Sequence, residues 1–258
     1  MDNVNRTLYI PLYGKAFVSR QGLILKDPDA EAIWETEGFP LKGKAASKWL
    51  AYTMGMRSAV FDNWLRENLT DADVVLHLGC GLDSRCHRIG CGNPWYDVDF
   101  PAVIRERRRY FSDSESYHMI GADLRENWLA HIRPGGRALV VMEGVSMYLT
   151  AEERLALLKS LTAHFSQVKL LLDAYTVFAA KATKYKNPIN DVGVTQVHGF
   201  DDPRDLEDGT GFRFIKEHSL TPDAMIGELP KRERGFFRMM FAGSMAHRIY
   251  RLYEYNTK

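Results

Sequence analysis

The chain has 258 residues, with 34 basic and 33 acidic side chains and a formal net charge of +1. That length suits one large α/β domain, and the even charge balance excludes the strongly basic surface typical of nucleic-acid binding. No apolar run approaches the roughly 20 residues of a membrane span, and the first residues lack the order of a signal peptide. We therefore expect a cytoplasmic protein that acts on a small molecule, without nucleic-acid or membrane partners.

The three cysteines form neither a disulfide framework nor a metal site. Cys80, Cys86 and Cys91 are odd in number, and five and then four residues separate them, which is not a zinc-ribbon spacing. We expect reduced, structural thiols and no bound metal.

The first 70 residues carry no strong strand signal and predict helices that cap a sheet at its ligand-binding end. Pro11 suits the first turn of a helix from Leu12 to about Arg20. A longer helix is predicted from about Ala46 to Leu69, because apolar side chains recur there at helical spacing: Trp49, Leu50, Met54, Val60, Phe61, Trp64 and Leu65.

One cation, Arg57, falls on the apolar stripe of the longer helix. A guanidinium that faces inward needs an anionic partner. That partner is either a carboxylate of the protein or a carboxylate of a ligand, and we favour the ligand. Lys15, on the shorter helix, is a weaker candidate for the same role.

The stretch from Val74 to Arg85 reads as a buried strand followed by a glycine turn. Val74, Val75, Leu76 and Leu78 are typical of a parallel strand covered on both faces. Gly79 and Gly81 then allow a sharp turn and a close approach of ligand, at the sheet edge where α/β proteins bind ligands. Ser84 stands where the dinucleotide fingerprint has a third glycine. This favours a nucleoside without phosphates, such as S-adenosylmethionine, over a pyrophosphate cofactor. The alternative is an ordinary turn in which Asp83 only caps a helix.

The second and third predicted strands also end in acids. The strand from Pro94 to Asp99 stops about 20 residues after the glycine turn, where an acid can bind a ribose diol. We favour Asp99 over Asp97 because it lies nearer the ligand edge, and Phe100 and Pro101 then begin a helix. The strand from Tyr117 to Leu124 ends at Asp123, which binds an adenine amine or simply caps the next helix.

The fourth predicted strand runs from Arg137 to Gly144, beside the first, and is apolar until Glu143 at its tip. A buried glutamate there needs a partner. Thr150 with Glu153 forms a capping box that begins the next helix. The intervening loop must line the cleft, which places Ser146 and Tyr148 in it.

Three more strands complete a seven-stranded, mostly parallel, doubly wound sheet whose last strand is antiparallel. They are predicted at Lys169–Tyr175, Phe212–Ser219 and Ala246–Tyr255. The polar, irregular segment 176–210 between the first two of these is interpreted as a substrate-side insertion. His198 lies in it, and a lone loop histidine is more often incidental than catalytic.

Four blocks carry a family resemblance, in family order. They are Leu78-Gly-Cys-Gly-Leu-Asp-Ser-Arg85, Tyr96-Asp-Val-Asp-Phe-Pro101, Gly121-Ala-Asp-Leu-Arg125 and Glu143-Gly-Val-Ser-Met-Tyr-Leu149. With Arg57 and the early Pro-Leu-Tyr-Gly-Lys segment, the chain resembles the leucine carboxyl methyltransferase family, which includes tetracenomycin-type polyketide O-methyltransferases. The resemblance implies a class I, Rossmann-like methyltransferase. We expect a single domain with a cap (1–70), a cofactor-binding core (71–175) and a substrate-side segment (176–258).

The resemblance also implies roles for individual residues. S-adenosylmethionine would lie on Gly79, Cys80, Gly81 and Asp83, and Arg57 and Lys15 would bind its carboxylate. Asp99, beside Phe100, would bind the ribose, and Asp123 and Leu124 would contact the adenine. Glu143 and Gly144 would face the amino group. Tyr148 would face the substrate, with Ser146 as the second choice of donor. Mild departures include Ser84, where the family usually has threonine.

We expect the methyl acceptor to be a carboxylate of a small or polyketide-like acid. A carboxylate is already ionised at neutral pH, whereas a phenol needs a general base, and the acids of the motifs all serve the cofactor. The alternatives are a phenol or other hydroxyl, with His198 as base, the C-terminus of a protein, or a non-catalytic cofactor-binding module. The chain lacks room for the large insertions of the phosphatase-modifying enzymes, which argues against a protein C-terminus.

Overall fold

The structure is a computed structural model and describes residues 7–90, 92–182 and 197–257. Its strands are β1 (Val74–Leu78), β2 (Trp95–Asp99), β3 (Tyr117–Gly121), β4 (Arg137–Met142), β5 (Gln167–Tyr175), β6 (Phe212–His218) and β7 (Tyr250–Thr257). Its α-helices are α2 (Tyr9–Arg20), α3 (Pro28–Glu37), α4 (Lys48–Asn68), α5 (Arg85–Ile89), α6 (Pro101–Arg107), α7 (Ala151–His164), α8 (Val177–Ala182), α9 (Asp223–Glu228), α10 (Lys231–Phe241) and α11 (Ser244–His247).

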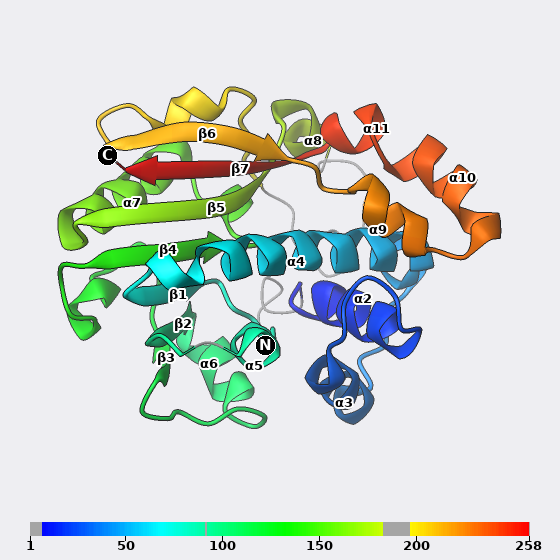
Figure 1. Ribbon diagram of the computed structural model, residues 1–258, viewed down its shortest axis with the longest axis horizontal. Coiled ribbons are helices and arrows are strands. Elements are labelled where there is room, and N and C mark those ends of the chain that lie inside the picture. Colours follow the sequence, from blue (N-terminus) through cyan, green and yellow to red (C-terminus); the bar gives the residue numbers. More distant parts are fainter. Residues whose placement is uncertain (1–6, 91, 183–196, 258) are drawn as a thin grey trace.

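The strands form one sheet in the order β3-β2-β1-β4-β5-β7-β6 (Figure 1). The strands from β3 to β5 pair in parallel, with β1 between β2 and β4. Strand β7 pairs antiparallel with both β5 and β6. The predicted doubly wound sheet of seven strands with an antiparallel last strand is confirmed.

Alternation along the strands divides the core between the two faces of the sheet. Val75 of β1 and Leu139 of β4 belong to the cluster that contains Phe61 of α4. Leu76 of β1 belongs to the cluster that contains Leu161 of α7. Both faces are therefore apolar and covered by helices, which is why the parallel strands read as continuous hydrophobic runs.

Helix α4 is the long helix predicted from the apolar stripe, with Ser47 as its N-cap. Helix α2 starts at Tyr9, three residues before the predicted start. Pro11 still lies in the first turn, where a backbone N–H has no intrahelical acceptor, so the earlier start leaves proline tolerated.

The parallel strands end on one side of the molecule, and helices from both ends of the chain gather there (Figure 1). Helix α2 packs against α4 and α3. From the other end of the chain, Phe237 of α10 is fully buried and meets Tyr52 of α4 edge-to-face. The cap over the sheet's ligand edge therefore comprises α9 to α11 as well as the predicted N-terminal helices.

The prediction for the last strand was wrong at its start. Residues from Ala246 onward alternate, but Ser244–His247 form α11, and β7 begins only at Tyr250. Pairing explains the shift, because Tyr250 is the first residue that finds a partner on β5, opposite Tyr175.

The segment predicted to be irregular, 176–210, contains α8 and a 3-10 turn at Pro203–Leu206, and its residues 183–196 lie outside the described part of the chain. None of the helices in the described part has the length and hydropathy needed to span a bilayer.

Candidate cofactor and acceptor site

A cavity of about 960 Å³ opens beyond the carboxyl ends of the parallel strands. Its walls come from α2, α4, the strand ends, α8, α10 and α11. The cofactor-site residues expected from the sequence all line it: Lys15, Arg57, Gly79, Cys80, Gly81, Asp83, Asp99, Phe100, Asp123, Leu124, Glu143 and Gly144. Tyr148 lines it too, whereas Ser146 does not.

The glycine turn has little room for side chains. Gly79 has φ +71°, and a Cβ there would lie 2.0 Å from Cγ2 of Val145. Gly81 has φ +52°, and a Cβ there would point toward Leu8, another lining residue, at 3.6 Å. Any larger residue would be strained at both positions and would fill part of the cavity floor.

Asp99 is the acid of β2 that reaches the cavity. Its Oδ2 accepts a hydrogen bond from the Gly81 N–H at 2.8 Å, and its Oδ1 accepts one from the Phe100 N–H at 2.7 Å. Burial raises its pKa, although both backbone donors oppose this effect. Each oxygen keeps a lone pair for a further donor, so this carboxylate can still accept from a diol.

Asp97, the alternative acid of β2, is fully buried and does not line the cavity. It accepts hydrogen bonds from Trp95 Nε1 at 2.8 Å and Tyr117 Oη at 2.5 Å, and it pairs with Arg107. Burial acts to raise its pKa, but Arg107 and His77 outweigh burial and lower the pKa to about 2. Asp97 therefore has a structural role.

Asp123 and Leu124 lie at the cavity wall beyond β3. No α-helix starts at Asp123, so the helix-cap interpretation of this acid was wrong. Its carboxylate instead binds the side chain of Arg125, with Nε to Oδ1 at 2.8 Å.

Glu143, at the tip of β4, holds two buried arginines. Its Oε1 accepts from Arg57 Nε at 2.9 Å and from Ser58 Oγ at 3.0 Å, and its Oε2 accepts from Arg85. Burial acts to raise its pKa, but Arg85 and Arg57 outweigh burial and lower the pKa to about 2. Glu143 is therefore ionised throughout the physiological range.

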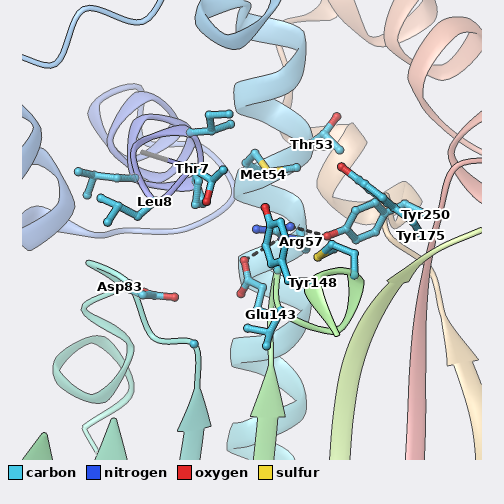
Figure 2. A pocket seen from close by; sticks show the side chains of 18 of the residues that line it. Thr7, Leu8, Thr53, Met54, Arg57, Asp83, Glu143, Tyr148, Tyr175 and Tyr250 are labelled. Atoms are coloured by element: carbon cyan, nitrogen blue, oxygen red, sulfur yellow. Dashed lines mark hydrogen bonds and ion pairs between the residues drawn. The ribbon is translucent and has the colours of Figure 1, made fainter. Parts of the chain in front are cut away.

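Asp83 makes a second cluster of buried charges across the cavity (Figure 2). It pairs with Lys15 at 3.4 Å, Arg85 at 3.1 Å and Arg88 at 3.0 Å. Burial acts to raise its pKa, but these three cations hold it well below its usual range. Arg85 bonds to both Asp83 and Glu143 and so links the two clusters.

Asp173, near the end of β5, is a site residue that the sequence analysis missed. It accepts from the Gly144 N–H at 2.8 Å, from Tyr250 Oη at 2.7 Å, and pairs with Arg57 Nη1 at 3.2 Å. Burial raises its pKa to about 6, against the effect of Arg57 and Tyr250. A signal was present, because this acid follows the apolar run of the predicted strand and lies two residues before its end at Tyr175.

Arg57 therefore binds Glu143 at the tip of β4 and Asp173 in β5. It also donates from Nη1 to the hydroxyl of Tyr250 at 2.7 Å. The interpretation that it pairs with protein carboxylates is confirmed by this geometry. Its Nη2 has no hydrogen-bond partner among the described residues and lies beside Gly144 at the cavity. Lys15 has one carboxylate partner and also lines the cavity, which makes it a stronger candidate than the sequence suggested.

The two predicted substrate-facing hydroxyls have different surroundings. Tyr148 lines the cavity, and its hydroxyl forms a hydrogen bond with the side chain of Thr7. Ser146 is buried, and its hydroxyl donates to the backbone carbonyl of Asp173. Because Ser146 is turned from the cavity, the geometry does not support it as a substrate donor.

His198 does not line the cavity either. Its backbone N–H donates to the Met147 carbonyl at 2.7 Å, which fixes the chain beside the loop that carries Tyr148. Within the described ranges, no cluster of three or more histidine, cysteine or acidic side chains could hold a metal ion. Neither Cys80 nor Cys86 forms a disulfide in the described part of the chain, and Cys91 lies outside it.

The side of the cavity away from Asp83 and Lys15 is largely apolar. Its lining side chains come from α8, α10 and the segment before β7: Phe178, Met240, Phe241, Met245 and Ile249. Three tyrosines, Tyr148, Tyr175 and Tyr250, bring hydroxyl groups to this part of the cavity (Figure 2).

Comparison with known proteins decides the family. The sequence profile of the leucine carboxyl methyltransferase family matches residues 4–162. The chain belongs to the leucine carboxyl methyltransferase family. The tetracenomycin polyketide synthesis O-methyltransferase TcmP of Streptomyces glaucescens is 30% identical over 236 residues, which cover 88% of this chain and 87% of that protein. The S-adenosyl-L-methionine-dependent methyltransferase dpfgK of Gibberella zeae is 29% identical, covering 64% of this chain and 61% of that one.

Solved structures of methyltransferases share the fold. Magnesium protoporphyrin IX methyltransferase from Synechocystis, with bound S-adenosylhomocysteine, superposes with a TM-score of 0.52 at 12% identity, covering 88% of this chain and 93% of that one. An S-adenosylmethionine-dependent methyltransferase from Mesorhizobium loti superposes with a TM-score of 0.54 at 12% identity. The match covers 75% of this chain and 96% of that one. These structures show that the fold is that of class I methyltransferases. The family match and the relatives support methyl transfer from S-adenosylmethionine.

The residues present fit this cofactor. The glycine turn leaves space where a Cβ would intrude, Asp99 offers lone pairs at the end of β2, and buried groups of both charges surround the end of the cavity between Lys15 and Glu143. A zwitterionic amino acid joined to a ribose requires this combination of donors and acceptors.

Proposed function

We propose that the protein transfers a methyl group to a carboxylate oxygen of a small, largely apolar, polyketide-like acid. The observation that carries the proposal is the division of the cavity. Its lining carboxylates all bind donors of the protein near the cofactor end, while the opposite wall is largely apolar and carries tyrosine hydroxyls. The likeness to TcmP, named as a polyketide O-methyltransferase, supports an oxygen acceptor.

In this proposal the site needs no general base. When bound, S-adenosylmethionine supplies an electrophilic methyl group on a sulfonium. A carboxylate oxygen would take this methyl group without giving up a proton, and the electron pair of the broken C–S bond would remain on sulfur. A carboxylic acid with a pKa of about 4 is already ionised at pH 7, so the protein has to position and desolvate it.

The chain's own residues would divide the cofactor between them. We propose that Lys15 and Arg57 Nη2, which no other described residue binds, hold the carboxylate of the cofactor, and that Asp99 accepts from its ribose. Asp123 and Leu124 would contact the adenine. Glu143 and Asp83, both ionised, would face its ammonium group.

The test is a panel of aromatic and aliphatic acids and phenols, incubated with cofactor labelled in its methyl group. We expect an acid to be labelled and to release labelled methanol under mild base, because an ester hydrolyses and an aryl ether does not. Base-stable label on a phenol would contradict the carboxylate acceptor. Turnover of any compound would exclude a non-catalytic binding module.

His198 provides a second test of the acceptor atom. If the acceptor is a carboxylate, His198→Ala should keep kcat/KM within a few-fold of the wild-type value. A loss of about 100-fold or more, which is typical of removing a general base, would favour hydroxyl methylation instead.

A further inference from the structure

Tyr175 lies at the end of β5 and lines the cavity. Its backbone carbonyl accepts from the Phe200 N–H at 3.0 Å. Its ring meets that of Tyr250 edge-to-face, with centroids 5.0 Å apart. Tyr250 is itself held by Arg57 and Asp173, so the position of Tyr175 is fixed from two sides.

The hydroxyl of Tyr175 has no hydrogen-bond partner within the described ranges, unlike that of Tyr250. Tyr175 is half-buried, although it lies at the end of a strand whose other side chains are mostly in the core. Its exposed part faces the cavity that it lines. In Figure 2 the rings of Tyr175 and Tyr250 lie to one side of Arg57, with Leu8 and Asp83 on the other.

Tyr148 provides a second phenol close by, near enough to raise the pKa of Tyr175 further. The Tyr148 side chain hydrogen-bonds that of Thr7, and a phenol can both donate and accept, so one hydrogen bond does not exhaust its capacity. Burial raises the pKa of both phenols, so each remains a neutral O–H donor at pH 7.

We propose that Tyr175 is a second donor to the methyl acceptor and, with Tyr148, binds the oxygens of the acceptor group. This inference rests on the proposed methyl transfer to an oxygen acceptor at this site. Apart from these phenols, the wall around Tyr175 is largely apolar, with Phe178, Met245 and Ile249 nearby in the lining. The phenols are therefore among the small number of polar groups there that could orient an acceptor oxygen. In apolar pockets, a small number of well-placed polar groups commonly fixes the orientation of the ligand.

The chemistry predicts an unusual kinetic signature. The acceptor oxygens carry most negative charge before the reaction and lose it as the C–O bond forms. Hydrogen bonds to them are therefore stronger in the bound substrate than in the transition state. Removing such a donor should raise KM without lowering kcat, and a slight rise in kcat is also consistent with this role, because more binding energy is lost from the bound substrate than from the transition state.

The experiment compares Tyr175→Phe with wild type on the panel compound that wild type methylates fastest. We expect KM to rise about 10- to 100-fold, the range for a hydrogen bond to a charged group, with kcat within about threefold. The affinity for S-adenosylhomocysteine, measured by calorimetry, should not change. Tyr96→Phe removes a phenol hydroxyl outside the cavity and should match wild type throughout.

Tyr148→Phe and the double variant complete the design. If both phenols bind the same acceptor group, the two changes in KM should not simply multiply. An unchanged KM in Tyr175→Phe would overturn the inference, as would a fall in thermal stability or in S-adenosylhomocysteine affinity that accounts for the loss.

Two separate measurements test the two ideas: the identity of the labelled compound tests the proposed function, and the KM of Tyr175→Phe tests this inference. If the labelled compound is a phenol, the carboxylate proposal fails, but a raised KM in Tyr175→Phe still supports the donor. If a carboxylate is labelled and Tyr175→Phe behaves as wild type, only the inference fails. A wild-type protein that methylates no compound of the panel would contradict both.

Discussion

Arg57 and Glu143 are bonded to each other across 86 residues of sequence, with Nε to Oε1 at 2.9 Å. The sequence predicted that Arg57 binds a ligand, but in the structure it pairs with the protein's own carboxylates. A buried ion pair positions both charges, and breaking it would leave one of them uncompensated. The consequence is that Lys15, whose one ion pair among the described residues is with Asp83 at 3.4 Å, is the cation freer to bind an added carboxylate.

The first prediction concerns that lysine. Lys15→Met should lower the affinity for S-adenosylhomocysteine about 10-fold or more, because a charge-assisted hydrogen bond is lost. Affinity for 5′-methylthioadenosine, which lacks the amino-acid part, should stay within about twofold. Asp83 keeps Arg85 and Arg88 as partners, so the variant should fold. Calorimetry with both ligands measures the difference, and the exposed Lys26→Met is the control. Equal losses for the two ligands would contradict the assignment.

Asp99 should affect both ligands, since both contain the ribose. Asp99→Ala removes two charge-assisted hydrogen bonds, and we expect the affinity for S-adenosylhomocysteine and for 5′-methylthioadenosine to fall at least about 10-fold each. Asp208→Ala, at an exposed position, should change neither. If Asp99→Ala binds both ligands as wild type does, Asp99 is the wrong acid.

Gly79 offers a prediction about the turn itself. Gly79→Ala adds a Cβ at φ +71° within 2.0 Å of Val145 Cγ2, and we expect a loss of about 2–4 kcal/mol in the free energy of unfolding. Gly235, inside α10, has an ordinary φ, and a Cβ added there would meet open space. Gly235→Ala should therefore stabilise by up to about 1 kcal/mol. Urea unfolding followed by tryptophan fluorescence tests both, and equal effects would refute the strained turn.

The last prediction concerns pH. Arg107 and His77 lower the pKa of Asp97 to about 2 in the folded protein against the opposing effect of burial, whereas the unfolded value is about 3.9. A lowered folded pKa gives stability that is present above the unfolded pKa and is lost as the pH falls toward 2.

Asp97→Asn should therefore destabilise the protein at pH 7, by on the order of 3 kcal/mol for a broken buried pair. The difference in free energy of unfolding between Asp97→Asn and wild type should shrink below about pH 4. Denaturant unfolding at pH 7, 5 and 3.5 measures this difference, with the exposed Asp113→Asn as the reference. A gap that stays constant over this range would show that the Asp97 charge does not contribute.

Local pattern was enough for most of the fold. Strands β1 to β5 were predicted within a few residues because a buried parallel strand is a continuous apolar run, and its ligand edge is marked by the acid or glycine that ends it. The start of β7 was missed because alternation in Ala246–Ile249 has the same appearance in a strand and in a short helix. Only pairing with β5 distinguishes the two.

The sequence by itself determined the glycine turn, the acids at the strand ends and the family, because these depend on residue type and short-range order. Only the tertiary structure decided which charges pair. It joined Arg57 to Glu143 and Asp173, turned Ser146 inward and brought Tyr175 and Tyr250 beside Tyr148. The physical reason is that pairing of buried charges depends on distances of a few ångströms between segments far apart in the chain. Those distances arise only when α4, β4, β5 and β7 pack together.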